Sequence, residues 1–245
     1  MHEQDNCPVG KGTYGKVYMA LDQQTSNIVV VKRQRADQDS TRELSYCTAI
    51  QNATSRHILQ MRDHFWPTHA TEKGVHYLYI VYDWMDSCMW DVVWARAGLF
   101  QRSEAKGLSR QALDGVACLH ALNIVHGDLS FKNMLVRRTA SAGGGSQFEL
   151  KITDYGSCFT KLDGVKLTSA PACTEHCRAP ELFLKCAPQE LTAAIDIWAM
   201  GALLGSVACG AILVSGFEGM LACLGPLTKV WPDGCRLAGF KVMQH

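Results

Sequence analysis

The sequence lacks an excess of charge of either sign. Its 24 Lys and Arg residues are nearly balanced by 23 Asp and Glu residues, which gives a formal net charge of +1. No block of like charge stands out. Proteins that bind nucleic acids mainly through the phosphate backbone need a basic surface. The charge balance therefore argues against a nucleic-acid-binding protein.

The sequence also lacks a C-x-x-C pair, although it contains 11 cysteines. An odd and scattered set of cysteines is poor material for a disulfide framework. The nearest approach to a metal motif is the group Cys173, His176 and Cys177, which has no second ligand pair at zinc-finger spacing. We therefore interpret the cysteines as reduced thiols that pack as small hydrophobic side chains.

The sequence also lacks the pattern of an export signal at its start. Residues 1–6 read MHEQDN, with neither the positive start nor the apolar run of such a signal, so we expect a cytoplasmic or nuclear protein. Residues 197–217 carry no charge and are long enough to span a membrane. Glycine and serine residues dilute this run, however, and no basic cluster flanks it. A buried helix followed by a turn explains the run as well.

The sequence does contain enough apolar residues for a folded core. Apolar residues make up 47% of the 245 residues, as in an ordinary globular protein of one large domain or two small ones. Short apolar runs at 17–21, 28–31 and 78–82 predict an antiparallel sheet. One helix interrupts these strands and is predicted to start at Ser40, because Ser40 and Glu43 form a capping-box signature.

After residue 100 the pattern becomes mainly helical, and an apolar helical face starts at Ser103. Residues 139–147, TASAGGGSQ, are a low-complexity insertion between apolar runs at 134–136 and 148–152. Such an insertion between two apolar runs predicts a hairpin whose long tip is solvated.

A glycine-rich motif lies near the start of the chain. It reads G-x-G-x-x-G-x-V and comprises Gly10, Lys11, Gly12, Thr13, Tyr14, Gly15, Lys16 and Val17. A dinucleotide-binding fingerprint shares this pattern but needs a helix directly after it. A strand-like run follows here instead, which favours a glycine-rich hairpin that approaches phosphate oxygens. The next apolar strand ends in Lys32, which either holds phosphates or is an exposed residue at a sheet edge.

Three further motifs follow in order along the chain. They are H-G-D-L-S-F-K-N at 126–133, D-Y-G at 154–156 and A-P-E at 179–181. With the glycine-rich motif they resemble the signature set of the protein kinases, over residues 7 to about 234. The resemblance is greatest to the cyclin-dependent kinases and related (CMGC) group, on the segments 12–15, 78–82, 177–181, 224–226 and 230–232. In this family the run at 196–201 resembles the start of the core helix, which explains the apolar run without a membrane.

This resemblance implies an α+β fold with two lobes. Residues 1–85 would form the ATP-binding N-lobe, a small antiparallel sheet with one helix. Residues 86–245 would form a mainly helical C-lobe that contains the catalytic loop, the activation segment and the core helix. The helical lobe of the family continues well beyond the Trp-Pro element at 231–232, whereas this chain ends at His245. The resemblance therefore implies an incomplete C-lobe without its last helices.

The activity implied by the resemblance is transfer of the γ-phosphoryl group of Mg-ATP to serine or threonine hydroxyls of a protein. Lys32 would hold the α- and β-phosphates of ATP, and Asn133 and Asp154 would hold Mg²⁺. Asp128 would accept the proton of the substrate hydroxyl. The alternative is a catalytically impaired pseudokinase or a scaffold that binds ATP.

The resemblance also assigns the rest of the nucleotide site. Tyr82 lies at the gatekeeper position, and residues 83–85 would present hinge backbone to adenine. The predicted ATP-binding residues are Gly10, Lys11, Gly12, Thr13, Tyr14, Gly15, Val17, Val30, Lys32, Tyr82, Asp83, Met85 and Leu135.

Several positions depart from the family pattern. Glu43 is the glutamate that would pair with Lys32, but only ten residues separate the two. Glu43 could instead close a capping box with Ser40. Ser130 stands where serine/threonine kinases carry a lysine, and Lys132 stands where tyrosine kinases carry an arginine. We expect Lys132 to substitute as the cation for the γ-phosphate.

Thr174 bears on the substrate class. It lies seven residues before Glu181, where serine/threonine kinases place a threonine close to the catalytic aspartate. This match favours serine and threonine over tyrosine as the accepting residues.

The resemblance identifies four regulatory candidates. Thr13 and Tyr14 match the inhibitory pair of the cyclin-dependent kinases, where an added phosphate would repel the phosphates of ATP. Thr168 and Ser169 lie about where the family carries its activating phosphate. Gly127 replaces the arginine that pairs with that phosphate, so we expect activity to depend little on it.

The expected partner is a protein substrate. The helix around Glu43 resembles the one that regulatory proteins position in cyclin-dependent kinases, although residues 40–45 match the partner-binding sequence only in part. A cyclin-like or other regulatory protein is therefore a second candidate partner. Neither nucleic acid nor membrane is expected.

Overall fold

The computed structural model describes residues 8–12, 15–67, 74–96, 100–140, 146–160, 173–186 and 190–224. Four regulatory candidates of the sequence analysis, Thr13, Tyr14, Thr168 and Ser169, lie outside these residues, as does the Trp-Pro element at 231–232.

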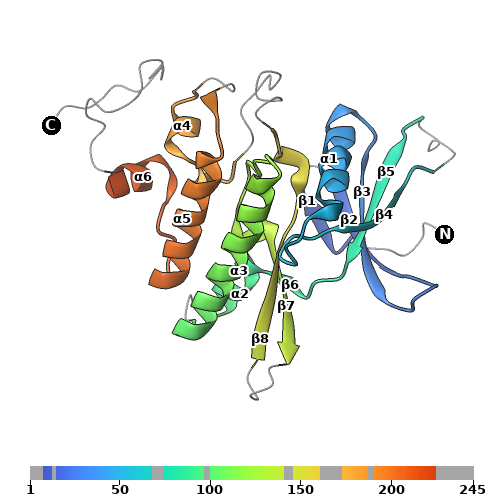
Figure 1. The fold of residues 1–245 in the computed structure, drawn as a ribbon, viewed down its shortest axis with the longest axis horizontal. Helices are drawn as coiled ribbons and strands as arrows, with labels where there is room; N and C mark the ends of the chain where they lie inside the picture. Colours follow the sequence, from blue (N-terminus) through green and yellow to red (C-terminus); the bar gives the residue numbers. More distant parts are fainter. Residues whose placement is uncertain are drawn as a thin grey trace.

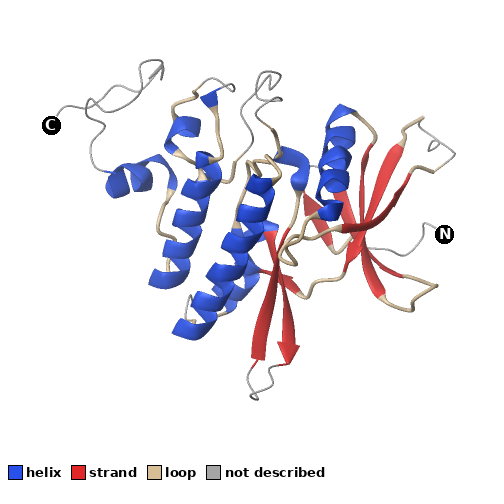
Figure 2. Cartoon of the chain, in the orientation of Figure 1, coloured by secondary structure: helices blue, strands red, loops and turns tan. Residues whose placement is uncertain are grey.

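The first part of the chain forms a five-stranded antiparallel sheet with one long helix (Figures 1 and 2). The strands are β1 (Gly10–Gly12), β2 (Gly15–Leu21), β3 (Ile28–Arg35), β4 (Met61–Phe65) and β5 (Tyr77–Asp83), in the order β1-β2-β3-β5-β4. The three apolar runs predicted as strands lie in β2, β3 and β5, which confirms those predictions. Strand β1 belongs to the predicted glycine-rich hairpin, whereas the sequence analysis did not identify β4.

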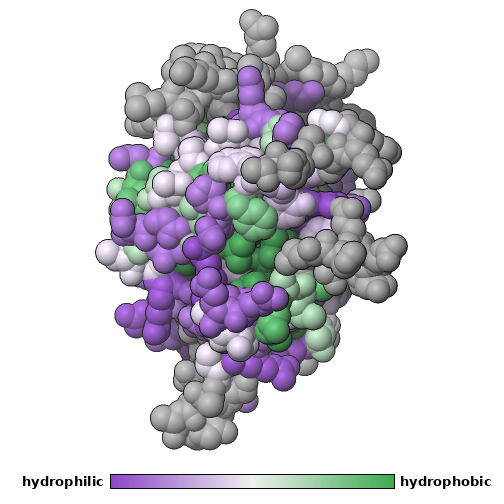
Figure 3. All heavy atoms as spheres, turned by 90° about the vertical axis from the view of Figure 1, so that its right-hand side faces the viewer, coloured by the Kyte–Doolittle hydropathy of each residue, from purple (hydrophilic) through white to green (hydrophobic). Residues whose placement is uncertain are grey.

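Strand β5 shows why the sheet forms where it does. Leu78, Ile80 and Tyr82 are buried, whereas the residues between them are half-buried. Alternation with a period of two places one set of side chains against the core. Figure 3 views the molecule from the side at the right of Figure 1, where apolar side chains form a band in the middle of the face beside polar ones.

Helix α1 (Gln38–Ala49) continues into the 3₁₀ turn η1 (Ile50–Asn52). Its N-cap is Asp37, whose Oδ1 accepts a hydrogen bond from the Ser40 backbone amide at 2.9 Å, while Ser40 Oγ accepts one from the Asp37 amide at 2.9 Å. The predicted capping box of Ser40 with Glu43 is therefore wrong. An aspartate caps as well as a serine, and its charge also suits the positive end of the helix dipole. The earlier start leaves Glu43 free to point into the protein.

The second part of the chain is mainly helical and lies on the other side of the molecule (Figure 1). Its larger elements are β6 (Ser87–Cys88), α2 (Met89–Ala95), α3 (Arg102–Ala121), β7 (Met134–Ala140), β8 (Ser146–Ile152), α4 (Pro180–Phe183), α5 (Ala194–Cys209) and α6 (Gly216–Leu224). Three 3₁₀ turns connect them: η2 (Phe131–Asn133), η3 (Tyr155–Ser157) and η4 (Glu175–Cys177). The helix predicted from Ser103 is α3. The antiparallel sheet followed by helices confirms the predicted α+β fold.

The hairpin β7–β8 is longer than predicted. Thr139 pairs with Gln147 and Ala140 pairs with Ser146, so both ends of the low-complexity insertion belong to the strands. The ladder extends because backbone hydrogen bonds between antiparallel strands do not require particular side chains. The expected tip is therefore restricted to residues 141–145, which lie outside the described residues.

The charge-free run at 197–217 is a buried helix, a turn and the start of a second helix. Helix α5 ends at Gly210, whose positive φ of 68° suits a left-handed C-cap. Ser206 Oγ donates to Ala202 O at 2.7 Å and accepts from Leu213 N at 2.9 Å, which holds the turn against α5. Within the described part of the chain, no helix is both long and apolar enough to cross a membrane.

Candidate active site

Lys32 is the centre of a charged cluster between the sheet and α1. Its Nζ donates to Glu43 Oε1 at 2.6 Å and to Asp154 Oδ1 at 2.9 Å. Glu43 is buried, and its side chain is only 2% exposed. The pairing of Lys32 with Glu43, left open by the sequence, is therefore the arrangement found. The short spacing suffices because only Ala36 and Asp37 connect β3 to α1.

The cluster stabilises the charged forms of Lys32 and Asp154. Burial alone would lower the pKa of Lys32, but the carboxylates of Glu43 and Asp154 outweigh it and raise that pKa above its ordinary value. Burial alone would raise the pKa of Asp154, but the charge of Lys32 and its hydrogen bond lower that pKa overall. Lys32 and Asp154 therefore form an ion pair at neutral pH.

The loop that contains Asp128 is anchored by a buried carboxylate on α5. Asp196, which is 1% exposed, accepts from the backbone amides of His126 at 2.7 Å and Gly127 at 3.0 Å. His120 Nε2 on α3 lies 2.9 Å from the same carboxylate. Gly127 has a positive φ of 79°, a conformation that a residue with a side chain rarely adopts. The anchor therefore fixes the backbone immediately before Asp128.

Asp128 is held by hydrogen bonds from two other segments. Its Oδ1 accepts from the Thr174 amide at 2.9 Å and from the Thr174 hydroxyl at 2.8 Å. Asn133 Nδ2 donates to the Asp128 carbonyl at 2.8 Å and to Oδ2 at 3.2 Å. Burial raises the pKa of Asp128; the Thr174 bonds and His126 oppose that rise, and the charge of Asp154 adds to it. The result is a carboxylate whose pKa is higher than that of an ordinary aspartate.

Asp154 has an unusual backbone conformation. Its φ of 68° and ψ of 84° lie in the left-handed region, which is rare for residues other than glycine and clusters at functional sites. The next residue holds this segment in place: the Tyr155 hydroxyl is buried and lies 3.0 Å from Leu59 O and 2.8 Å from Ile152 O. Thr153 N donates to Asn133 O at 3.0 Å, which ties the Asp154 segment to the catalytic loop.

Asn133 and Asp154 fit a hard divalent cation. Both can offer oxygen ligands, as Mg²⁺ prefers. The amide nitrogen of Asn133 is turned toward Asp128, which leaves the amide oxygen for a metal. The lowered pKa of Asp154 keeps its carboxylate ionised. The donor set is thus suited to magnesium.

Lys132 is not engaged with the charged cluster. It is exposed, and its Nζ lies 5.6 Å from the centre of the Trp90 ring. Lys32, not Lys132, is the cation that contacts Asp154 in this structure. Ser130, another departure from the family pattern, is 3% exposed.

The glycine-rich segment forms the β1–β2 hairpin. Gly10 pairs with Val17 and Gly12 pairs with Gly15, and Thr13 and Tyr14 between them are outside the described residues. A Cβ atom on Gly15 would collide with the Arg33 carbonyl of β3, whereas one on Gly10 would make ordinary contact with Val17. Gly15 is therefore required for strand packing.

Val30 and Tyr82, two of the residues predicted to surround adenine, lie on neighbouring strands. Val30 pairs with Tyr82 across β3 and β5, and Tyr82 is buried with its hydroxyl 3.3 Å from Cys47 Sγ. Met85 is buried and Leu135 on β7 is half-buried. Asp83 forms an ion pair with Arg62 at 3.0 Å. The side chain of Lys11 is outside the described residues.

Sequence reasoning missed three features of this site. It used Asp196 to identify the core helix but did not assign it as the anchor of the catalytic loop. It also missed His120, which approaches Asp196, and the hydroxyl of Tyr155. The sequence signal that could have found this role is an aspartate at the start of an apolar helix. A charged residue that is buried there needs polar partners.

Comparisons with known proteins agree with this geometry. The model of the protein kinase domain family matches residues 4–222. The chain is 27% identical to cyclin-dependent kinase G-2 of Oryza sativa subsp. indica, over 96% of this chain and 32% of that protein. It is 29% identical to mitogen-activated protein kinase 4 of Arabidopsis thaliana, over 81% of this chain and 50% of that protein. It is 28% identical to cyclin-dependent kinase B2-1 of Oryza sativa subsp. japonica, over 94% of this chain and 72% of that protein.

These relatives confirm the predicted resemblance to the cyclin-dependent kinases and related group. The chain spans between about a third and a half of the length of the first relatives it matches. Because the family model covers most of the chain, and because Lys32, Asp128, Asn133 and Asp154 lie together between the sheet and the helices, this chain belongs to the protein kinase domain family.

Proposed function

We propose that the chain is a protein serine/threonine kinase that transfers the γ-phosphoryl group of ATP to hydroxyls of protein substrates. The observation that carries this proposal is one site with two differently charged groups of residues. We call them the Lys32 corner, with Glu43 and Asp154, and the Asp128 corner, with Thr174 and Asn133. Lys32 is ion-paired with Asp154 and Glu43, and Asp128 is held next to them by Thr174 and Asn133. Phosphoryl transfer depends mainly on positioning and on compensation of negative charge.

Nucleotide binding is assigned to the Lys32 corner. The Lys32 ammonium group is charged and held in place, so it can contact the α- and β-phosphates of ATP. Magnesium, held by Asn133 and Asp154, would supply charge neutralisation for the phosphates. The glycine-rich hairpin would cover the phosphates, and Val17, Val30, Tyr82, Met85 and Leu135 would surround the base and hinge.

The proton of the substrate hydroxyl is assigned to Asp128. The Asp128 pKa is raised, mainly by burial, which makes its carboxylate a better proton acceptor, and its Oδ2 lies toward Asn133 while Oδ1 binds Thr174. A general base must be within hydrogen-bond reach of the proton it takes. The contact of Thr174 with Asp128 supports serine and threonine as the substrate class. Residues 1–85 and 86–245 are the proposed lobes on either side of this site.

An ATP-binding scaffold is the second candidate, and the position of Lys132 favours it. Lys132 lies over the Trp90 ring, outside the ion-paired cluster of Lys32, Glu43 and Asp154. Ser130, at the position where the lysine of serine/threonine kinases is expected, has no positive charge. A cyclin-like partner at α1, and a location in the cytoplasm or nucleus, are further parts of the proposal that imaging and co-purification of the tagged chain would test.

The test is phosphoryl transfer by the purified chain. Wild type with Mg-ATP is expected to label mixed serine and threonine peptides, and Asp128→Asn is expected to lose this activity. Asp114→Asn, an exposed aspartate on α3, is the matched control and should retain it. Thermal stabilisation by Mg-ATP is measured in parallel. Stabilisation without any transfer by folded wild type would overturn the kinase proposal and support the scaffold.

A further inference from the structure

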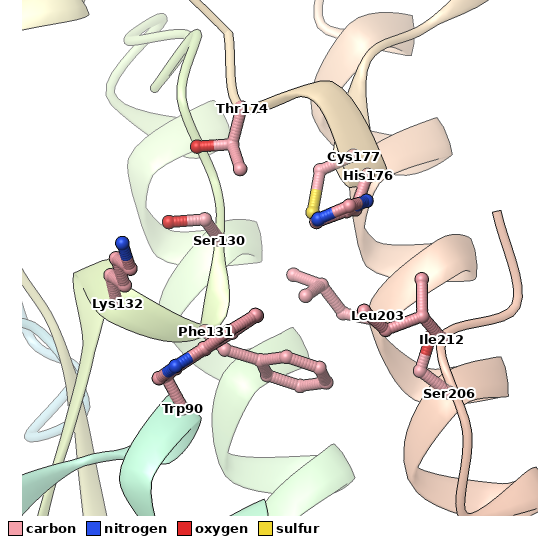
Figure 4. Close-up of a pocket in the computed structure, with 10 residues that line it drawn as sticks. All are labelled: Trp90, Ser130, Phe131, Lys132, Thr174, His176, Cys177, Leu203, Ser206 and Ile212. Atoms are coloured by element: carbon pink, nitrogen blue, oxygen red, sulfur yellow. The ribbon is translucent and has the colours of Figure 1, made fainter. Parts of the chain in front are cut away.

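A pocket of about 110 Å³ opens beside the loop that contains Asp128, and Ser130, Phe131 and Lys132 of that loop line it. Lys132 and the His176 ring stand on opposite sides of it, with Trp90 and Phe131 beneath (Figure 4). The His176 ring is stacked on Trp90 at 6.4 Å between ring centres. Leu203 of α5 completes an apolar floor. The pocket is therefore amphipathic, with an apolar base and polar groups around it.

Two polar atoms of this pocket are buried and have no hydrogen-bond partner within the described residues. They are Ser130 Oγ and His176 Nδ1. Ser130 as a whole is 3% exposed. The other hydroxyls of the lining are already engaged, since Thr174 Oγ1 donates to Asp128 and Ser206 Oγ donates to Ala202 O. Buried polar groups are nearly always paired in folded proteins, so this pair indicates a ligand group that the isolated chain does not supply.

The charge of the lining selects the chemistry of that group. Lys132 is the charged side chain of the lining, and none of the described residues that line the pocket carries a carboxylate. Lysine offers only donors, and a serine hydroxyl and a histidine ring nitrogen can both donate. The nearby Asp128 carboxylate is already held by Thr174 and Asn133. A group that accepts several hydrogen bonds and carries negative charge matches all three sites.

We propose that this pocket binds the side chain of a glutamate close to the accepting hydroxyl of a protein substrate. The carboxylate would accept hydrogen bonds from Ser130, His176 and Lys132, while the methylene groups of the glutamate pack on Phe131 and Leu203. Thr174 lines the pocket and also contacts Asp128, so the glutamate lies near the accepting residue in sequence. This inference rests on the proposed function, because it names the substrate of the same site.

The experiment measures peptide binding and phosphoryl transfer separately. Fluorescent peptides with alanine in place of the acceptor carry Glu, Gln or Lys at one flanking position at a time, and fluorescence anisotropy reports their affinity. We expect Glu to bind about tenfold more tightly than Lys at one position, a difference of about 1.4 kcal/mol, with Gln between them. The same peptides with a serine acceptor report transfer.

Two variants locate the effect in the pocket. His176→Phe keeps an aromatic ring on Trp90 but removes Nδ1, and Ser130→Ala removes the buried hydroxyl. Each is expected to reduce the preference for Glu over Lys to about twofold to threefold. Ser103→Ala, an exposed serine on α3, is the matched control and should keep the full preference. Thermal unfolding of every variant is measured, and two independent variants guard against misfolding of one.

The outcomes separate this inference from the proposed function. Equal affinity for all peptides, tighter binding of Lys, or a full preference in both pocket variants would overturn the inference. Preference for Glu in binding without transfer would keep the inference and overturn the kinase activity. Transfer without any preference would keep the kinase activity and overturn the inference alone.

Discussion

The two aspartates of the site lie in corners that are built differently. Asp154 lies beside the cation of Lys32, whereas Asp128 is held by neutral hydrogen-bond donors from Thr174 and Asn133. Burial raises the pKa of both carboxyl groups, but the charge of Lys32 reverses the result for Asp154 and lowers its pKa. The same residue type thus has two different environments. They agree with the two proposed roles, in which ionised Asp154 holds a metal and Asp128 accepts a proton.

Loss of each carboxylate should separate these tasks with the largest effects of all. Asp128→Asn is expected to lower the transfer rate by about 10²-fold to 10⁴-fold, the range of general base catalysis, while Mg-ATP affinity stays close to wild type. Asp154→Asn should weaken Mg-ATP binding itself, because it removes a charge that would hold the metal. Transfer rates and thermal stabilisation by Mg-ATP measure the two effects. Equal loss of nucleotide affinity in both variants would contradict the division of roles.

The Asp128 corner depends on a second buried carboxylate, and removing it should be the next largest effect. Asp196→Ala leaves the amides of His126 and Gly127 without their acceptor. An unsatisfied buried donor costs about 1–3 kcal/mol, so we expect a loss of about 3 kcal/mol in the free energy of unfolding, measured with urea. Asp39→Ala on α1, where the aspartate side chain is 65% exposed, is the control. Unchanged stability of Asp196→Ala would show that the anchor does not hold the loop.

The Tyr155 hydroxyl supports the segment around Asp154, and its removal should have a smaller effect. Tyr155→Phe keeps the buried ring but removes the single O–H donor that lies between Leu59 O and Ile152 O. We expect a loss of about 1 kcal/mol in the free energy of unfolding and a faster exchange of the backbone amides around Asp154, measured by hydrogen exchange. Tyr18→Phe on β2 is the matched control. A variant as stable and as protected as wild type would exclude this role of the hydroxyl.

The pH dependence of activity and of stability should also distinguish the two aspartates. Transfer requires ionised Asp128, so activity is expected to fall on acidification at a higher pH than an ordinary aspartate would set, because the Asp128 pKa is raised. Thr174→Val removes a hydrogen bond that lowers this pKa, and should move the acid limb to still higher pH. Asp154 affects the stability of the fold, because its pKa is lowered and not raised. Its lowered pKa stabilises the fold above the unfolded value, and this contribution is lost as the pH falls through the folded value.

The smallest expected effect concerns the activation segment. Gly127 has no side chain that could pair with a phosphate, and its φ of 79° disfavours the arginine found at this position in the family. Thr168→Ala combined with Ser169→Ala should therefore change the transfer rate by less than about twofold. Wild type treated with an activating kinase is compared with the double variant. A large gain that depends on phosphate and occurs in wild type alone would contradict this prediction.

Much of the architecture could be predicted because it depends on local patterns. Apolar runs with a period of two identified β2, β3 and β5, and the helical face identified α3. Local patterns could not identify the N-cap of α1, since Asp37 and Ser40 are both good N-cap residues. The choice between them determines how the helix presents Glu43. The roles of Lys32 and Asp154 could be inferred only from the order of the motifs, because the two residues are 122 positions apart in sequence.

The sequence by itself indicated the candidate residues for chemistry, several of the strands and helices that bear them, and the family to which they point. Only the tertiary structure decided that Glu43 pairs with Lys32, that Asp196 anchors the catalytic loop, and that Asp128 and Asp154 have opposite pKa shifts. The physical reason is the range of the interactions. Backbone periodicity and capping act over a few residues along the chain, whereas Coulomb interactions and desolvation depend on distance and burial in three dimensions.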